Sequence, residues 1–196
     1  NTIMRRKIVI ERAERLNQVP PNAVKESDQY KKRLQARGIE PIDLTIGRLD
    51  FPVPSPTATS LVEAIEEMAN ERPASATVVP EFQEAFARWF SRRFDVDLDP
   101  ETQVLPLMGS KTGVACGALS LVNPGETVLV PDPAYPAYRT AAIMAGANVR
   151  AIPLVERNDF LPDLRQVEPA VAQQAKLMYV SYPNNPTGAV ADIQLF

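Results

Sequence analysis

Through its first half, the chain has the hydrophobic spacing of separate amphipathic helices. Apolar residues recur at intervals of three and four over 59–70 and over 80–90, and the second stretch begins with a proline, which suits the first turn of a helix. A weaker pattern of the same kind covers 22–36, and residues 1–18 predict a charged helical arm. Residues 41–46 predict a short strand, which runs into an ordered loop rich in glycine and proline at 47–54.

From residue 104 the pattern changes to short apolar runs that alternate with helix-like stretches. The expected strands span 104–107, 127–130, 148–154 and 176–181, and the expected helices lie near 110–122, 136–145 and 163–174. Parallel strands need crossover connections of this kind. The sequence therefore predicts an α/β fold, a mainly parallel sheet with helices on both faces, preceded by the N-terminal helical arm.

The composition is that of a globular protein, and it removes several kinds of chemistry. The chain has 196 residues, of which 45% are hydrophobic, and its formal charge of −3 gives no basic surface for nucleic acid. No apolar run is long enough to cross a membrane and no secretory signal is visible, so a cytoplasmic protein is expected. Because the chain has no histidine, Ser-His-Asp catalysis and His-ligated zinc are excluded, and no metal site is expected. The single cysteine, Cys116, lies in an apolar stretch and is expected in the core.

Three motifs follow predicted strands, at the edge of a parallel sheet where ligands bind. They are Gly-Ser-Lys-Thr-Gly at 109–113, Pro-Asp-Pro-Ala-Tyr-Pro at 131–136, and Tyr-Pro-Asn-Asn-Pro-Thr-Gly at 182–188. The first motif offers backbone N–H groups at the start of a helix, two hydroxyls and one ammonium, which together suit a phosphate. It matches neither a Walker A loop nor a dinucleotide fingerprint.

The second and third motifs hold a ring and an amide in restricted positions. Tyr135 stands between Pro133 and Pro136, and its ring suits stacking on a flat ligand. Asn185 precedes Pro186, which favours an extended backbone, and its amide can donate to a phenolic oxygen. Together the three motifs describe a pocket for a phosphorylated aromatic cofactor. Each motif alone also fits an ordinary turn: a helix start with a solvated lysine, a loop aromatic and a proline turn.

In this order and at these spacings, the motifs resemble those of the class I and II aminotransferases, which are pyridoxal-phosphate enzymes of fold type I. The similar segments also include Asp-Leu-Thr-Ile-Gly at 43–47, Asp-Phe-Pro at 50–52 and Asn-Pro-Gly-Glu at 123–126, so the resemblance covers most of the chain. The Gly-Ser-Lys triplet is most similar to the diaminopimelate-aminotransferase branch. The implied domains are an N-terminal arm with part of a small domain at 1–46, and the N-terminal portion of the cofactor-binding large domain at 47–196.

The resemblance implies a cofactor, pyridoxal 5'-phosphate, and a role for six residues. Gly47 would lie beside the α-carboxylate of the substrate. The implied partners are an amino acid, a 2-oxo acid and a second copy of the chain in a homodimer. The implied cofactor-binding residues are Ser110, Lys111 and Thr112 at the phosphate, Tyr135 on the pyridine ring, and Asn185 at the phenolic oxygen.

The chemistry implied by the resemblance is transfer of an amino group from an amino acid to a 2-oxo acid. The family uses a Schiff-base lysine, an aspartate at the pyridine nitrogen and an arginine at the substrate carboxylate. All three are expected beyond the end of this chain, so no catalytic residue is predicted within it and the chain alone is not expected to transaminate. Residues 74–80 lack the tyrosine and glycine that members usually have there, which argues against phosphate binding across a dimer by this segment.

Two other functions stay open at this point. One is a non-catalytic binding or assembly module that keeps an aminotransferase-like half-fold without the chemistry. The other is a lyase or synthase of fold type I, which would have the same cofactor site. The sequence does not predict which amino acid is used.

Overall fold

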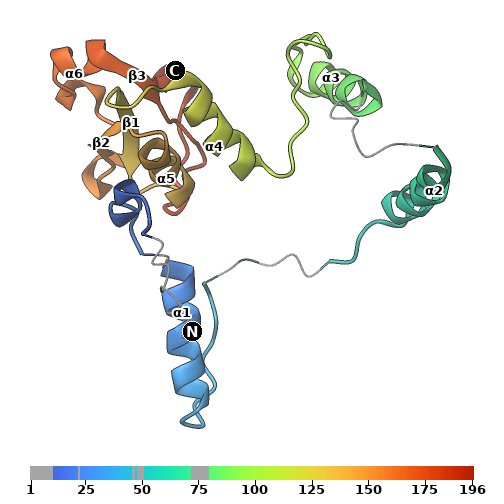
Figure 1. Ribbon diagram of the computed structural model, residues 1–196, viewed down its shortest axis with the longest axis horizontal. Helices are drawn as coiled ribbons and strands as arrows, with labels where there is room; N and C mark the ends of the chain where they lie inside the picture. Colours follow the sequence, from blue (N-terminus) through green and yellow to red (C-terminus); the bar gives the residue numbers. More distant parts are fainter. Residues whose placement is uncertain (1–10, 22, 46, 48–50, 72–79) are drawn as a thin grey trace, which may run out of the picture. The chain divides into compact units, whose positions relative to one another are not determined.

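The computed structural model describes residues 11–21, 23–45, 47, 51–71 and 80–196 (Figure 1). The chain divides into two compact units, one formed by Asn1–Pro21 with Met108–Phe196 and the other by Asn22–Leu107. The first is called the sheet unit below and the second the helical unit. The predicted domain boundary between residues 46 and 47 stays a prediction. Of the segment 74–80, which lacks the tyrosine and glycine usual in the family, residues 74–79 lie outside the described residues.

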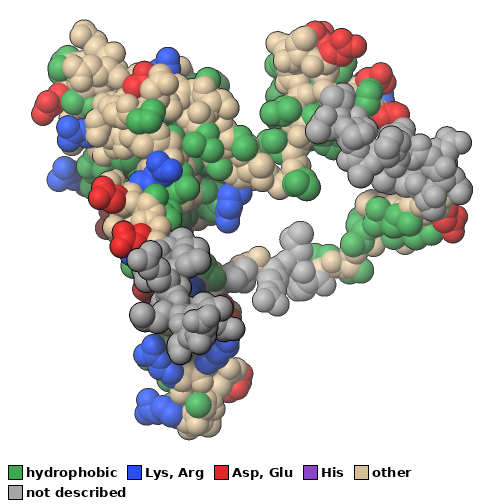
Figure 2. Space-filling view, viewed as in Figure 1, with side chains coloured by type: hydrophobic (Ala, Val, Ile, Leu, Met, Phe, Trp, Pro, Cys, Tyr) green, Lys and Arg blue, Asp and Glu red, His purple; other side chains and the backbone are tan. Residues whose placement is uncertain are grey.

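The helical unit contains three helices, α1 (Ala23–Gln35), α2 (Ser55–Glu71) and α3 (Pro80–Phe94). All three were expected, and α3 begins at the proline that the sequence marks as a helix start. Apolar side chains lie at the surface of α2 (Figure 2). Among them, Leu61, Val62 and Ile65 are more than half exposed. The spacing of apolar residues therefore predicted the helix correctly, although this face is not covered within the helical unit.

The predicted strand at 41–46 is wrong for its described residues, 41–45, which form no strand. Asp43 instead organises this segment: it accepts hydrogen bonds from Lys31 Nζ at 2.7 Å, Thr45 N at 3.0 Å and Thr45 Oγ1 at 2.6 Å. These bonds, that from Lys31 above all, hold the pKa of the Asp43 carboxyl well below its usual range. A strand needs a neighbouring strand for its backbone groups, and side-chain bonds replace that neighbour here.

The aromatic residues of α3 pack against one another, as their helical spacing suggests. Five rings from Phe82 to Phe94 have neighbouring centroids 4.7–6.4 Å apart. On the same helix Gln83 is buried, and its Nε2 donates to the carbonyls of Pro100 and Val104, both at 2.8 Å. These two bonds fasten the loop after α3 to the helix.

The predicted strand at 104–107 is also absent from the structure. This segment belongs to the helical unit, where the backbone carbonyl of Val104 accepts its hydrogen bond from the side chain of Gln83. An apolar run becomes a strand only where a second strand pairs with it. Hydrophobic pattern alone therefore overestimated the number of strands.

The sheet unit is built on three parallel strands, β1 (Thr127–Asp132), β2 (Asn148–Pro153) and β3 (Ala175–Met178). Their order is β2-β1-β3, with Thr127 opposite Asn148 and Leu129 opposite Met178. This confirms the predicted α/β fold with its parallel sheet (Figure 1). Because β1 and β3 are neighbours and run in the same direction, the segments that follow them leave the sheet at the same edge.

One face of the sheet packs on α4 (Ser110–Leu121) and α5 (Pro136–Met144). Val128 and Val130 of β1 lie against Ala118 of α4 and the alanines of α5, whose small side chains allow a close approach. Within the sheet unit, Cys116 lies on the exposed side of α4, so the expectation that it belongs to the core is wrong. Burial of alternate strand residues on this face fits a covered parallel sheet.

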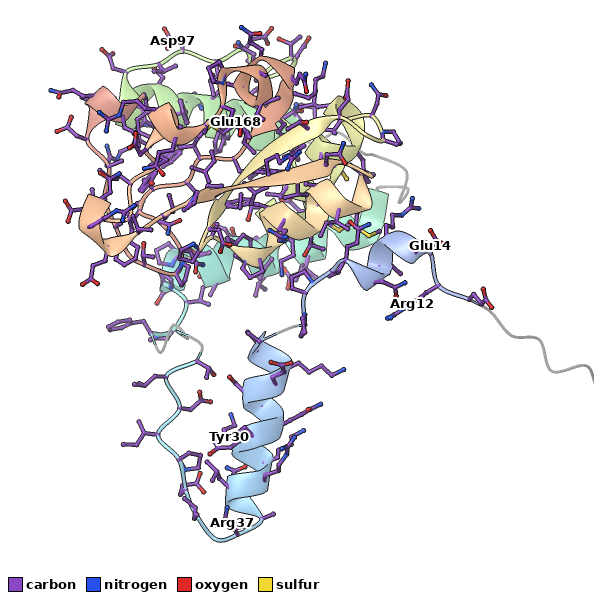
Figure 3. The ribbon with its side chains drawn as sticks, turned by 90° about the vertical axis from the view of Figure 1, so that its left-hand side faces the viewer. Arg12, Glu14, Tyr30, Arg37, Asp97 and Glu168 are labelled. Carbon is purple, nitrogen blue, oxygen red and sulfur yellow. The ribbon has the colours of Figure 1, made fainter. Side chains whose placement is uncertain are left out.

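The opposite face contains Leu129 and Ile152, which are both buried beside the segment that leads into α6 (Pro169–Gln174). The helix expected at 163–174 is divided into a 3₁₀ turn, Leu164–Gln166, and α6. Pro169 explains the division, because proline disfavours helical backbone in the residue before it and itself suits a helix start. In Figure 3, Glu168 marks the residue just ahead of α6.

The remaining regular segments are three more 3₁₀ turns, Glu14–Asn17, Glu156–Asn158 and Ile193–Leu195. The first is the only helical part of the predicted arm among residues 11–21, and it packs against α5; the expected helix over 1–10 lies outside the described residues. In the described part of the chain, no helix has the length and apolar character needed to cross a membrane.

Candidate functional site

The first motif forms the turn into α4. Gly109 precedes the helix with φ of 85°, a left-handed backbone that favours glycine, and it contributes no capping side chain. Thr112 is bonded within the turn, since its backbone N–H donates to the Gly109 carbonyl and its hydroxyl to the Met108 carbonyl, both at 3.1 Å. Ser110 and Lys111 are exposed, so their hydroxyl and ammonium are the accessible donors at the positive end of the helix dipole.

The second motif begins where β1 ends, and it meets the first. Tyr135 caps α5, with Pro136 in the first turn, and its ring is partly exposed. The ammonium of Lys111 lies over this ring, 5.7 Å from the centroid, a distance at which a cation and an aromatic face attract. The structure thus brings a predicted phosphate donor and the predicted stacking ring side by side, although they are 24 positions apart in the sequence.

Two further tyrosines, Tyr138 and Tyr179, pack behind the ring of Tyr135. Tyr138 meets it edge to face, with centroids 5.6 Å apart, and is itself stacked on Tyr179 at 4.7 Å with an interplanar angle of 17°. Burial, together with the nearby Tyr138, raises the pKa of the Tyr179 hydroxyl. That hydroxyl donates a long bond, 3.5 Å, to the Val114 carbonyl of α4. The three rings therefore pack together beside the ends of the strands, and the Tyr179 hydroxyl joins them to α4.

The third motif follows β3 and is joined to the second by Asn184. This side chain is 5% exposed, and its Nδ2 donates to the Pro133 carbonyl at 3.3 Å and to Thr187 Oγ1 at 2.9 Å. The next residue, Asn185, is exposed. The two adjacent asparagines therefore do different things: Asn184 holds the motif in place, and Asn185 faces outward with its amide accessible.

The predicted site residues fall into three groups in the structure. Lys111 and Tyr135 are in direct contact, with Ser110 and Thr112 in the same turn as Lys111. Asn185 is joined to this group through its neighbour Asn184. Gly47 is an exposed residue of the helical unit, and its role beside a substrate carboxylate stays a prediction.

The residues that sequence reasoning missed are the supporting ones: Asn184, Thr187, Tyr138 and Tyr179. Tyr138 follows Tyr135 by three positions in a helix, a spacing that places two side chains on one face, so this contact was detectable in principle. The role of Asn184 was not, because two consecutive asparagines look alike in a sequence.

Parallel strands with a donor-rich helix start, a tyrosine ring and a hydrogen-bonded turn at one edge place the chain in the α/β class and offer groups of the kind that suit an anionic, planar ligand. The chain matches the family described as aminotransferase class I and II over residues 39–195, and it belongs to that family. Aminotransferases of this family depend on pyridoxal 5'-phosphate. Its phosphate and its flat pyridine ring fit, respectively, the donors of the first motif and the ring of Tyr135.

Curated relatives include the LL-diaminopimelate aminotransferases of Aquifex aeolicus and Syntrophobacter fumaroxidans. The first is 44% identical over 96% of this chain and 49% of its own length, and the second 43% identical over 94% and 48%. The chain thus spans about half the length of the curated relatives it matches.

Two solved structures similar to this chain also match it over almost its whole length but over about half of their own. BacF from Bacillus subtilis superposes with a TM-score of 0.81 at 34% identity, over 95% of this chain and 48% of its own. A probable N-succinyldiaminopimelate aminotransferase from Thermus thermophilus gives a TM-score of 0.78 at 39% identity, over 87% and 46%.

Proposed function

We propose that this chain supplies the phosphate- and ring-binding part of a pyridoxal-phosphate site in an aminotransferase. The observation that carries the proposal is the contact between Lys111 and Tyr135 at the strand ends, because it combines an anion donor with a stacking ring. Membership of the aminotransferase family supports the same function. The complete reaction is amino-group transfer between an amino acid and a 2-oxo acid.

Each residue of the site has a separate task in this proposal. Ser110 and Lys111 bind the phosphate, with the helix dipole of α4 behind them, and Thr112 keeps the turn closed through its two bonds. Tyr135 covers one face of the pyridine ring and excludes water from it. When bound, the cofactor supplies an electron sink for bond breaking at the amino-acid α-carbon.

The amide of Asn185 donates a hydrogen bond to the phenolic oxygen of the cofactor, which sets the rotation of the ring about its phosphate anchor. Gly47 lies beside the substrate carboxylate, where the absence of a side chain allows a close approach. Two anchors at separate points of a flat ligand, one at the phosphate and one at the phenolic oxygen, suffice to orient it in its plane.

For the substrate, we propose an amino acid of the diaminopimelate kind, since both curated relatives described above are named LL-diaminopimelate aminotransferases. A cytoplasmic homodimer is the proposed assembly. Its test is the mass of the full-length protein in solution by light scattering, which would show two chains.

Binding by this chain is tested with pyridoxine 5'-phosphate, which has the ring and phosphate of the cofactor but no aldehyde that could attach to surface lysines. Calorimetric titration should show binding that is lost with pyridoxine, which lacks the phosphate, and that is stronger than binding of inorganic phosphate. Equal affinity for pyridoxine 5'-phosphate and inorganic phosphate would contradict the ring-binding role of Tyr135.

Amino transfer is tested on the full-length protein, supplied with pyridoxal 5'-phosphate, LL-diaminopimelate and a 2-oxo acid. The expected result is a new amino acid formed from the 2-oxo acid, detected by chromatography. Cofactor binding without transfer to any of a panel of 2-oxo acids would favour the non-catalytic binding module instead.

A further inference from the structure

Asn184 occupies an unusual place at the strand ends, because it is buried and polar and bridges two of the three motifs. Its Nδ2 donates to the carbonyl of Pro133 at 3.3 Å and to Thr187 Oγ1 at 2.9 Å. Pro133 lies two positions before Tyr135, and Thr187 lies two positions after Asn185. One side chain therefore joins the turn that presents the ring to the turn that presents the amide.

The main chain of Asn184 is fixed as well. Its N–H donates to the Ala189 carbonyl at 2.8 Å, and its carbonyl accepts from Gly188 N at 2.7 Å. Thr187 Oγ1 also accepts from Ala189 N, at 3.3 Å. The turn is thus closed on itself, and Asn185 is the exposed residue that it projects.

We propose that Asn184 is a positioning residue, which sets the distance and direction of the Asn185 amide relative to the ring of Tyr135. This inference rests on the proposed function, because it concerns how the two groups are aimed at one flat ligand. Asn184 is buried and its two acceptors are partly buried, so loss of the amide leaves both acceptors without their side-chain donor and removes the side-chain bridge between the two turns.

Gln83 provides a matched control for this role. It is the other buried polar residue in the described part of the chain, with an exposed fraction of 6% against 5% for Asn184, and its amide also donates two hydrogen bonds. Both of its acceptors, the carbonyls of Pro100 and Val104, are backbone groups of the helical unit. Loss of its amide removes similar bonds without releasing the strand-end turns.

The first experiment compares two ligands. Asn184→Ala should raise the Kd for pyridoxine 5'-phosphate about tenfold, a typical effect for residues that orient a ligand-binding group. It should leave the Kd for inorganic phosphate unchanged, because that ion needs only the first motif. Gln83→Ala should change neither constant. Equal weakening of both ligands by Asn184→Ala, or no weakening, would overturn the positioning role.

The second experiment needs no ligand and measures amide hydrogen exchange. Asn184→Ala should speed exchange at Gly188 and Ala189 in the third motif and also at Tyr135 and Tyr138 in the second. Thr187→Val keeps the bond to Pro133, so it should speed exchange in the third motif only. Unchanged exchange at Tyr135 and Tyr138 in Asn184→Ala would refute the bridge.

The two experiments separate this inference from the proposed function. If the unaltered chain does not bind pyridoxine 5'-phosphate, the proposed cofactor role fails, and the exchange measurement still decides whether Asn184 couples the turns. If Asn184→Ala does not fold, Asn184→Asp is used instead, since it keeps the shape of the side chain and removes the N–H donor. The same pattern of exchange is expected of it.

Discussion

Gln83 and Asn184 have the same chemistry in two regions of the molecule, yet their consequences differ. Each is a buried side-chain amide that donates two hydrogen bonds. Gln83 ties α3 to carbonyls 17 and 21 positions later, within one local loop of the helical unit. Asn184 reaches a carbonyl 51 positions away, on a turn that leaves the neighbouring strand of the sheet.

Topology, and not the hydrogen bond itself, therefore gives a buried amide its function. In the helical unit, the chain folds back on the helix it has just left. In the sheet unit, parallel strands bring distant segments to one edge, where an amide can couple two groups that face the same ligand. The core follows the same division, since every buried apolar residue in the described chain except Ala87 and Val104 belongs to the sheet unit.

The largest expected effect tests the shared part of the comparison. Gln83→Ala and Asn184→Ala should each lower the free energy of unfolding by about 1–3 kcal/mol, because each removes a buried amide and leaves two acceptors that are buried or partly buried without their donor. Urea denaturation followed by circular dichroism measures it. Gln173→Ala, which removes an exposed amide from α6, is the control and should have little effect. A loss in only one of the two buried variants would break the comparison.

The next prediction compares two lysines, Lys111 beside the strand-end motifs and Lys176 near the start of β3. Lys111→Ala should raise the Kd for pyridoxine 5'-phosphate about tenfold, as expected when an exposed charge-assisted hydrogen bond worth about 1.5 kcal/mol is lost. Lys176→Ala, an exposed lysine near the start of β3 and hence at the other end of the strand, should leave the Kd unchanged. Titration calorimetry decides, and equal losses would indicate a general charge effect.

A smaller effect is expected from the ring. Tyr135→Ala should weaken binding of pyridoxine 5'-phosphate by about 0.5–1.5 kcal/mol, the usual value of an aromatic contact. Tyr135→Phe keeps the ring and should bind like the unaltered chain. If Tyr135→Phe loses as much as Tyr135→Ala, the hydroxyl matters and stacking is the wrong explanation. The same titration measures both variants.

The smallest effect concerns the pH dependence of stability, and it compares partly buried tyrosines of the sheet unit with an exposed tyrosine of the helical unit. Burial raises the pKa of Tyr179 and of Tyr182 above the ordinary value of 10.0, so the folded state favours their neutral forms. Their contribution to stability is complete below pH 10, where the unfolded tyrosines begin to ionise, and falls as pH rises from there through the folded pKa.

Thermal unfolding between pH 8 and 11 measures this decline, which should be shallower in Tyr179→Phe. Tyr30, on α1 of the helical unit, is 61% exposed and serves as the matched control (Figure 3). Tyr30→Phe is measured over the same pH range. An equal flattening in both variants would show that burial of Tyr179 is not the cause.

Much of the fold was predictable because its signals are local. The spacing of apolar residues predicted α2 and α3, and the proline at residue 80 marked the start of α3. Strand predictions were correct where an apolar run found a partner, as in β1 and β2, and wrong at 104–107, where the Val104 carbonyl is taken by Gln83. Pairing is a property of two segments, so one segment read alone does not reveal it.

By itself, the sequence determined the three motifs, their order and the residue types that suit a phosphate, a flat ring and a phenolic oxygen. The alternation of strands and helices also predicted that the second and third motifs follow strands at one edge of a sheet, whereas the strand expected ahead of the first motif does not form. Only the tertiary structure decided that Lys111 lies over Tyr135, and that of two adjacent asparagines Asn184 is buried while Asn185 is exposed. The reason is physical: burial and the choice of a hydrogen-bond partner depend on segments far apart in the chain, and identical neighbouring residues have no local signal that separates them.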